Sequence, residues 1–402
     1  MNAFSAITYE LDDIESGTSE LAERILGNLK LQKNGFGLLL CDSDVDHDKF
    51  VRGLNERLGV PIVGFSTTAM LCAKGLCDSA AILTMVTSDD VDFSLAVSDP
   101  LTQENVAEQI ELTYHRALES LPEPPKLVMA FPPYTLDIML DVYPRELDRV
   151  SGGLPVFGGL PAHDEVYGRT SVYCGDRAAN DRLSVLLLSG AVKPVMTVKN
   201  SLGALTNLKR TVTSSKDNVV YRVGDDTFVH FLEQFSLDVT KLANPEDVTT
   251  SFTTYPLLVE RSDMENLDGI PIVRALHGVN LDTGSGTAIG EVPEGSTISV
   301  GVLQPEDIKT STRNSTSDIV EKMRENESDG YRYSMLFAVS CIARYYVMAS
   351  KKTLEAEALL EGLPENLAFS GYYSFGEICP TSVRPDKANN AGHNESLVLL
   401  AL

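Results

Sequence analysis

The chain has 402 residues and a formal net charge of −24 at pH 7, from 57 acidic and 33 basic residues. This negative field repels phosphate backbones and anionic lipid surfaces, so nucleic acid and membranes are excluded as expected partners. The length predicts two domains, and a hydrophobic content of 43% is enough for a sizeable core.

The cysteines and the N-terminal residues indicate the compartment. Cys72 and Cys77 lie five residues apart, but no second pair completes a zinc site, so we expect reduced and mostly buried thiols. The first twenty residues carry acidic side chains without lysine or arginine, which argues against a secretory or transit peptide. No apolar run approaches the roughly 18 residues of a membrane span. The sequence therefore predicts a cytoplasmic protein.

The first part of the chain alternates between strand and helix patterns. A strand over 3–11 precedes a helix whose apolar residues fall between 21 and 29, and a buried strand follows over 35–41. A second helix over 50–58 and a strand over 61–65 complete a strand, helix, strand unit. The next predicted elements are a hairpin around 88–90, a helix over 106–121, a strand over 126–131, a helix over 136–150, and strands at 156–157 and 183–188.

A polar stretch over 200–220 marks the expected boundary between two domains, residues 1–220 and 221–402. The later elements are a helix from 225 or 226, strands over 255–260, 272–277 and 297–303, helices over 317–323 and 331–350, and a closing strand over 397–402. The predicted fold is α/β (α+β). It has two halves, each a mixed β-sheet packed with helices, and a layered sandwich is one form of this arrangement.

Residues 370–396, SGYYSFGEICPTSVRPDKANNAGHNES, combine hydrogen-bonding side chains with turn-forming residues. Binding groups tend to lie on such loops when a rigid scaffold holds them. The carboxylate of Glu377 is expected to meet a ligand ammonium group, with Tyr373 and Asn394 adding hydrogen bonds. A loop-stabilising role for Glu377, and a bond from Asn394 to its own backbone, are the alternatives.

Arg344 follows Cys341 on a predicted helix, where its guanidinium would hold a carboxylate through two parallel hydrogen bonds. Pairing with a structural acid is the equally weighted alternative. If Arg344 and Glu377 line one cavity, they would bind the α-carboxylate and the α-amine of an amino acid.

Gly158 and Gly159 lie in VFGGLPAHD, which has no lysine and fits neither a P-loop nor a G-x-G-x-x-G motif. The two glycines are therefore expected to allow a tight turn at the end of a strand rather than to bind a phosphate group. His163 and Asp164 suggest a catalytic dyad only weakly, because no G-x-S-x-G elbow supplies a nucleophile.

Several of these pieces resemble FIST proteins. The run from Gly371 to Ile378, GYYSFGEI, followed by His393-Asn394-Glu395-Ser396, is similar to the closing signature of that family. The run from Pro155 to Leu160 with Asp164, the pair Cys341 and Arg344, and residues 59–69 are similar to its other motifs. The candidate ligand-binding residues are Arg344, Tyr373, Glu377, His393, Asn394, Gly158 and Gly159.

The resemblance implies a sensory module in intracellular signal transduction that binds a small molecule, with an amino acid as the favoured ligand. Because the chain ends on the signature, the output is expected from a separate partner such as a histidine kinase or a diguanylate cyclase. No cofactor is expected. The alternative that the resemblance allows is a haem-based nitric-oxide sensor with His393 as axial ligand, and His393 is otherwise a ligand contact or a structural residue. A hydrolase is the third reading, but no nucleophile with a base supports it, so the chain is not expected to be an enzyme.

Overall fold

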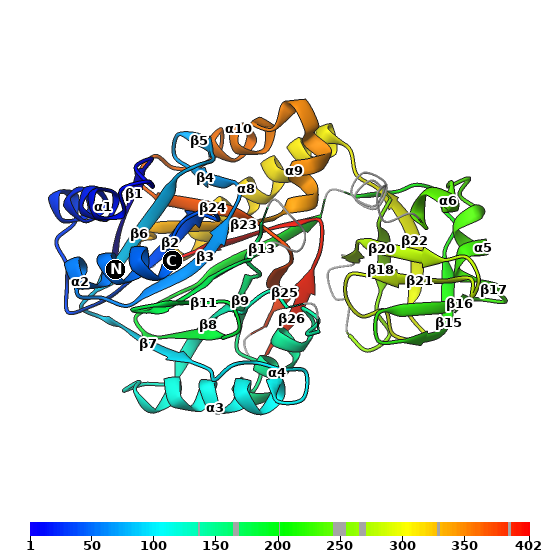
Figure 1. The fold of residues 1–402 in the computed structure, drawn as a ribbon, viewed down its shortest axis with the longest axis horizontal. Helices are drawn as coiled ribbons and strands as arrows, with labels where there is room; N and C mark the ends of the chain where they lie inside the picture. The colour runs from blue at the N-terminus through cyan, green and yellow to red at the C-terminus, as the bar shows by residue number, and fades with distance from the viewer. Residues whose placement is uncertain are drawn as a thin grey trace.

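The computed structural model describes residues 1–135, 137–163, 169–200, 202–243, 255–264, 271–327, 330–384 and 387–402. Figure 1 shows a large body that contains both termini, with a smaller lobe beside it. In the described part of the chain, the strands form four sheets, and helices pack against them. This arrangement confirms the predicted α/β class. Among the described residues, no helix combines the length and the apolar character that crossing a membrane would need.

The body consists of three units with the same topology. The first unit contains β1 (Asn2–Thr8), α1 (Ile14–Asn28), β2 (Asn34–Asp42), α2 (His47–Leu58), β3 (Ile62–Thr67), β4 (Met70–Cys72), β5 (Gly75–Cys77) and β6 (Ala81–Ser88). Its own strands pair in the order β1-β6-β2-β3, where only β2 and β3 are parallel. The hairpin β4–β5 leaves this sheet and joins another.

The second unit repeats this order. It contains β7 (Val91–Val97), α3 (Val106–Glu119), β8 (Pro125–Phe131), α4 (Val142–Ser151), β9 (Val156–Gly159), β10 (Val172–Gly175), β11 (Ala178–Ala179) and β12 (Ser184–Gly190). The strands pair as β7-β12-β8-β9, and β8 and β9 are the parallel pair. Here β10–β11 is the hairpin that departs.

The third unit has the same plan with a long insertion after its first strand. It contains β13 (Val195–Asn200), α8 (Pro305–Glu327), β23 (Met335–Cys341), α9 (Ile342–Met348), η2 (Ala349–Lys351), α10 (Leu354–Leu360), β24 (Ala368–Ser374), β25 (Glu377–Val383), β26 (Ala388–His393) and β27 (Ser396–Ala401). Its strands pair as β13-β27-β23-β24, with β23 parallel to β24.

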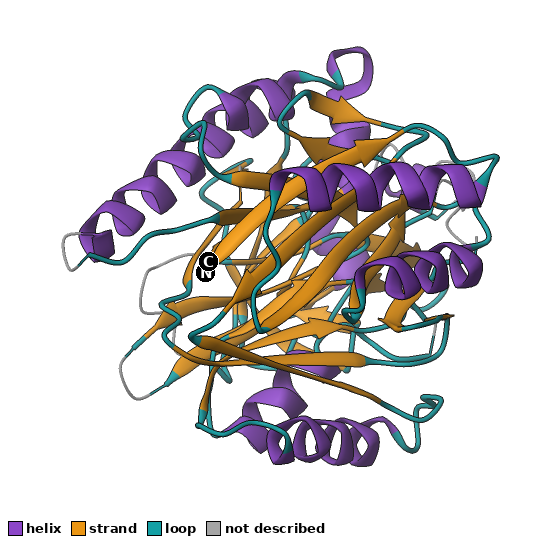
Figure 2. Cartoon of the chain, turned by 90° about the vertical axis from the view of Figure 1, so that its left-hand side faces the viewer, coloured by secondary structure: helices purple, strands orange, loops and turns teal. Residues whose placement is uncertain are grey.

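Each sheet is completed by the hairpin of another unit. The hairpin β4–β5 extends the third sheet beside β24, β10–β11 extends the first beside β3, and β25–β26 extends the second beside β9. In Figure 2 the strands run through the middle of the body and the helices lie along its outside. The three units therefore exchange strands in a closed cycle.

The inner faces of the three sheets share one apolar core. Aromatic rings join the sheets in pairs, with centroid distances of 5.2 Å for Phe65 and Phe131, 5.1 Å for Phe65 and Tyr372, and 5.8 Å for Phe157 and Phe337. Burying one such side chain contributes about 1.5–3 kcal/mol. The outer faces of the sheets are covered by α1 and α2, by α3 and α4, and by α8, α9 and α10.

The lobe is the insertion between β13 and α8. It contains β14 (Gly203–Ala204), β15 (Arg210–Lys216), β16 (Val219–Val223), β17 (Asp226–Thr227), α5 (Phe228–Glu233), α6 (Val239–Leu242), β18 (Leu257–Glu260), β19 (Ile272–Arg274), β20 (Leu276–Asn280), β21 (Ser285–Ala288) and β22 (Thr297–Val302). These strands form the fourth sheet, which packs on its own apolar cluster around Phe228 and Phe231. The expected domain boundary at 220/221 falls inside β16.

A buried ion pair attaches the lobe to the body. Arg274, at the end of β19, is fully buried, and its Nη2 lies 2.5 Å from the Oδ1 of Asp141, directly before α4. Its Nη1 donates to the carbonyl of Gly392 at 2.9 Å. Arg261 lies 3.3 Å from the same Asp141 oxygen, and the backbone N–H of Glu291 donates to the other oxygen at 2.9 Å.

The predicted helix over 331–350 is wrong in its first half. Residues Met335–Cys341 form the central strand β23, and the helix α9 begins only at Ile342. All seven strand residues are buried, and a short continuous apolar run does not distinguish a strand from a helix by periodicity. The predicted helix over 317–323 is also too short, because α8 spans Pro305–Glu327.

The buried pair that holds the lobe should be costly to break. Arg274→Ala leaves Asp141 buried with an incomplete set of donors, and we expect a loss of about 3–5 kcal/mol in the free energy of unfolding. Urea unfolding followed by circular dichroism measures this loss. The control is Arg313→Ala, whose ion pair with Glu361 is about half exposed and should contribute below about 1 kcal/mol. Equal effects of the two substitutions would contradict the structural role of Arg274.

Candidate functional site

The candidate site lies where the chain passes twice between two sheets. The turn at Phe375 and Gly376 leads from β24 in the third sheet to β25 in the second, and the turn at Asn394 and Glu395 leads back from β26 to β27. Cys341 ends β23 beside them, in register with Ser374. Both parts of the closing signature therefore meet at one end of these strands.

The backbone at these crossings leaves little space. A Cβ on Gly376 would lie 2.6 Å from a methyl group of Leu140. Glu395 has a φ of 54°, a left-handed conformation that non-glycine residues rarely adopt. Ser79, in the corresponding turn of the first unit, has a φ of 45°. The turn therefore explains the backbone conformation at 395, but a small residue would satisfy it, so the glutamate side chain needs another explanation.

We define the carboxyl cluster as Glu377, Glu395 and Cys341. The two glutamates are fully buried and the cysteine is 4% exposed. The backbone N–H of Ser396 donates to Oε2 of Glu377 at 3.3 Å. Oε1 of Glu377 and both carboxyl oxygens of Glu395 have no hydrogen-bond partner of normal geometry among the described residues. Unpartnered buried polar groups are rare and reduce the stability of the folded state. The cluster is therefore a candidate binding site for a group that would donate hydrogen bonds to these oxygens.

The environment favours protonated acids in the cluster. Burial raises the pKa of Glu377 well above its usual value, against the opposing effect of the Ser396 N–H. Burial also raises the pKa of Glu395 well above its usual value, and the nearby Glu377 adds to the shift. The pKa of the Cys341 thiol is raised by burial and then by Glu377. Without a counter-charge, the cluster is therefore expected to hold protons at neutral pH.

Arg344 is held by a structural acid. Its Nε and Nη2 lie 2.9 and 2.5 Å from Oε1 of Glu355 in α10, and both side chains are fully buried. Nη2 also donates to Thr312 in α8 at 3.0 Å, and the Ser340 hydroxyl donates to the other Glu355 oxygen at 2.9 Å. Its positive charge still lowers the pKa of both cluster glutamates. The structure thus places Arg344 behind the cluster, paired with Glu355.

The two tyrosines of β24 point to opposite faces of the third sheet. Tyr372 packs in the central core against Phe337, whereas Tyr373 packs on the helical side, with its ring 5.0 Å from that of Tyr345. Both hydroxyl groups are buried without a hydrogen-bond partner of normal geometry among the described residues. Burial raises the pKa of both phenols well above the usual value. Each hydroxyl is therefore a neutral group with unused hydrogen-bonding capacity.

His393 and Asn394 are engaged within the fold. Nε2 of His393 lies 2.9 Å from the carbonyl of Cys379, which can only accept, so this nitrogen carries the proton. Burial lowers the pKa of His393 to about 4, so the ring is neutral at pH 7. The amide of Asn394 donates to the carbonyl of His393 at 3.1 Å and accepts from the backbone N–H of Ala275 in the lobe at 3.4 Å.

Gly158 and Gly159 pack closely against neighbouring strands. They lie opposite Ile378 and Glu377 in the pairing of β9 with β25. A Cβ on Gly158 would lie 1.9 Å from the carbonyl oxygen of Ala130, and one on Gly159 would lie 2.7 Å from the Tyr372 hydroxyl. These contacts explain the two glycines as a close approach of backbones beside the cluster.

The structure thus gathers all seven candidate residues around the two crossings, but in different roles. Glu377 belongs to the carboxyl cluster, whereas Arg344, His393 and Asn394 have partners within the protein. Glu395 and Cys341 were not predicted as site residues from the sequence. Both nevertheless lie in the segments that resemble the family, Glu395 between Asn394 and Ser396, and Cys341 three residues before Arg344. Asp164 lies outside the described residues. Among the described residues, no group of three or more His, Cys, Asp or Glu side chains is arranged to hold a metal ion.

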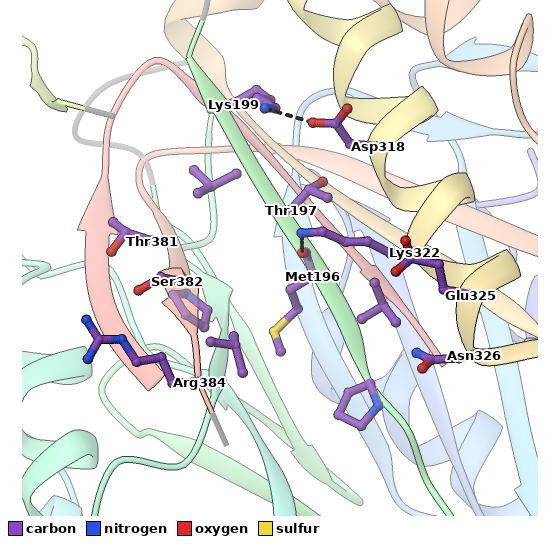
Figure 3. A pocket seen from close by; sticks show the side chains of 15 residues that line it. Met196, Thr197, Lys199, Asp318, Lys322, Glu325, Asn326, Thr381, Ser382 and Arg384 are labelled. Carbon is purple, nitrogen blue, oxygen red and sulfur yellow. Dashed lines mark hydrogen bonds and ion pairs between the residues drawn. The ribbon is translucent and has the colours of Figure 1, made fainter. Parts of the chain in front are cut away.

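A separate groove of about 810 Å³ lies between β13, α8 and the far end of β25. Figure 3 shows Lys199 paired with Asp318, and Lys322 reaching the carbonyl of Met196. None of the seven candidate residues lines this groove. It is distinct from the carboxyl cluster.

These features define a mixed α/β protein with a buried acidic site at the exchange of strands between sheets. The FIST N domain matches residues 35–226 and the FIST C domain matches residues 232–380. The chain belongs to the FIST family, whose domains are associated with sensory signal transduction. The matched region ends before His393 and Glu395. None of the curated proteins matches this sequence.

Two solved structures illustrate the more distant likenesses. A cyanuric acid hydrolase from A. caulinodans is 7% identical, with 99% of this chain and 98% of that chain covered, at a TM-score of 0.37. The PurLQS structure from Thermotoga maritima is 11% identical, with 99% of this chain and 72% of that chain covered, at a TM-score of 0.22. At such low TM-scores, neither likeness supports an argument about this chain.

The buried glutamates should make stability depend on pH. A carboxyl whose pKa is raised on folding binds its proton more tightly in the folded state, so its contribution is greatest below about pH 4.3, the unfolded pKa, and is lost as the pH rises toward the folded pKa. Glu395→Gln removes this dependence. We expect the stability of the variant relative to the parent to increase between pH 5 and 8 by about 1.4 kcal/mol per pH unit while Glu395 stays protonated in the folded parent.

Urea unfolding of both proteins at several pH values measures this difference. The matched control is Glu365→Gln, at an exposed position, which should show no comparable gain with pH. A constant difference between parent and Glu395→Gln across this range would contradict the raised pKa.

Proposed function

We propose that the protein is a sensor that binds a small molecule carrying an ammonium group at the carboxyl cluster. The observation that carries this proposal is the set of three buried carboxyl oxygens, on Glu377 and Glu395, that have no hydrogen-bond partner within the described part of the chain. An ammonium group offers three donors and a positive charge, so it satisfies both carboxyl groups as carboxylates. Ligand binding would then release the protons that the acids hold in the empty protein.

An amino acid remains the favoured ligand, recognised through its α-amine. Because Arg344 is paired with Glu355, its role is to add positive potential behind the cluster and to fix the position of α9 against α10. The hydroxyl group of Tyr372 lies beside Gly159, which is opposite Glu377, whereas that of Tyr373 points to the helical side of the same sheet. We assign Tyr372 as a candidate hydrogen-bond donor for the rest of the ligand, and Tyr373 as a residue that packs behind the cluster with Tyr345.

The position of the cluster connects ligand binding to the lobe. Asn394, directly before Glu395, accepts a hydrogen bond from Ala275 of the lobe, and Gly392 accepts one from Arg274. Both glutamates are fully buried, so a ligand reaches them only when the neighbouring chain moves. A ligand that binds one arrangement of lobe and body more tightly shifts the equilibrium toward it, which is sufficient for a sensor.

The output is proposed to come from a separate cytoplasmic signalling protein, such as a histidine kinase or a diguanylate cyclase, that distinguishes the two arrangements. We propose no enzymatic activity for the chain itself. The cluster has a buried thiol, Cys341, but its pKa is raised by burial, and a nucleophilic thiol needs the opposite shift.

A haem bound through His393 is the alternative cofactor proposal. It fits the present arrangement poorly, because Nε2 of His393 carries a proton that is donated to Cys379, and the side chain is 3% exposed. The visible absorbance spectrum of the purified protein tests it directly. A Soret band that disappears in His393→Ala would replace the ammonium proposal with a haem sensor.

Ligand binding is tested by thermal unfolding in the presence of single amino acids and simple amines, since a ligand that binds only the folded state raises the midpoint. We expect one of them to raise the midpoint of the parent. Removing one charged partner from a buried ion pair costs at least about 2 kcal/mol, so Glu395→Gln should weaken binding roughly thirtyfold or more. Isothermal titration calorimetry measures the change.

The control is Glu325→Gln, in the separate groove, which should bind as tightly as the parent. Unchanged affinity in both Glu395→Gln and Glu377→Gln would show that the ligand does not bind at the carboxyl cluster. A ligand series in which the neutral isosteres of amines bind as well as the amines would exclude ammonium recognition.

A further inference from the structure

A pair of cysteines in the first unit lies apart from the carboxyl cluster and has geometry of its own. Cys72 ends β4 and Cys77 ends β5, in the hairpin that extends the third sheet. Strand pairing sets Cys72 opposite Gly75 and Cys77 opposite Met70, so the two side chains are diagonal neighbours on the same face. Their sulfur atoms lie 2.9 Å apart.

All six cysteines are free and buried. A disulfide bond requires a sulfur separation of about 2.05 Å, so Cys72 and Cys77 need to approach by less than about 1 Å. The hairpin already fixes both backbones in register. The sulfur separation therefore brings the two thiols within reach of one bond inside a single hairpin.

The surroundings activate Cys72, and the pair lies close beneath the surface. The backbone N–H of Lys74 donates to the Cys72 sulfur at 3.4 Å. The Cys77 thiol, as a hydrogen-bond donor, lowers the pKa of Cys72 to about 7, and the same interaction raises the pKa of Cys77. Each cysteine is 5% exposed, and Ala73, Lys74 and the 59% exposed Tyr9 lie around them at the surface.

We propose that Cys72 and Cys77 form a peroxide-reactive dithiol that closes reversibly to a disulfide bond. The Cys72 thiolate attacks one oxygen of a hydroperoxide, the O–O bond breaks, and the other oxygen leaves as water or alcohol after taking up a proton. Cys77 then attacks the sulfenic acid sulfur of Cys72, and the hydroxyl group leaves as water. Two thiols and one hydrogen peroxide give one disulfide and two waters, with two electrons passing to the peroxide.

The pair is placed where its state affects the body rather than an isolated loop. β4 pairs with β24, and Cys72 lies opposite Ser370 in this pairing. The carbonyl of Ala69, just before β4, accepts the backbone N–H of Tyr373 at 3.1 Å. The dithiol proposal does not depend on the proposed ammonium ligand, and the two proposals are tested by separate experiments.

The experiment uses the full-length protein, reduced, freed of reductant and treated with hydrogen peroxide under native conditions. We expect the intact mass to fall by about 2 Da and the six free thiols to decrease to four, with both changes reversed by a dithiol reductant. Peptide mapping of the parent should find one link, between Cys72 and Cys77. The rate of thiol loss should fall about tenfold per pH unit below pH 7, as the Cys72 thiolate is protonated.

Variants assign the roles within the pair. Cys77→Ser should stop at a sulfenic acid on Cys72, trapped by dimedone, and Cys72→Ser should lose the reaction at this hairpin. Cys174→Ser, at a buried cysteine of the second unit, should react like the parent. The proposal would be overturned if all six thiols survive peroxide treatment or if peptide mapping finds a link between other cysteines. Because the mapping uses the parent protein, it tests the proposal even if a variant does not fold.

Discussion

The exchange of hairpins between the three sheets is the constraint on which the rest of the structure depends. Each unit builds a four-stranded sheet with one parallel pair, and each sheet has an edge that only the hairpin of another unit covers. Covering that edge satisfies backbone groups that would otherwise be left unpaired, and it brings three apolar faces together around one core. The chain must therefore cross between sheets at several turns. The carboxyl cluster lies at two of them.

The crossings between sheets explain some features of the site as structural, but they do not explain the buried glutamates. Close backbone approaches explain the glycines at 158, 159 and 376, and the crossing explains the left-handed backbone of Glu395. Neither requires two buried glutamates, three of whose four carboxyl oxygens lack a hydrogen-bond partner among the described residues. Ser79 fulfils the same backbone role in the first unit with a small side chain. Glu395, at the equivalent position of the third unit, and the adjacent Glu377 are therefore a cost in stability that a bound cation would offset.

Much of the fold class and of the site's position could be predicted from the sequence. Apolar periodicity located the early elements, as with the predicted helix over 50–58, which the structure shows as α2 (His47–Leu58), ended by Gly59 in the left-handed conformation. The exchange of strands could not be predicted, because hydrophobic patterns indicate that a strand is buried but not which strand it pairs with. Met335–Cys341 was assigned to a helix because a short, largely apolar run has no periodicity that distinguishes a strand from a helix. Arg344 was predicted to bind the carboxylate of a ligand. Its actual partner, Glu355, could not be recognised from the sequence because it lies in another helix and shares no motif with Arg344.

The exchange of hairpins also determines when the chain can complete its fold during synthesis on the ribosome. β4 and β5 are made within the first 80 residues, but their neighbour β24 emerges about 300 residues later, and β13 waits about 200 residues for β27. At a synthesis rate of about 5–20 residues per second, the early hairpin stays without its sheet for roughly 15 to 60 seconds. During this time the apolar side chains of Met70 and Leu71 lack the cover of the finished core. Nascent chains of this protein therefore present exposed strand edges of the kind that chaperones bind.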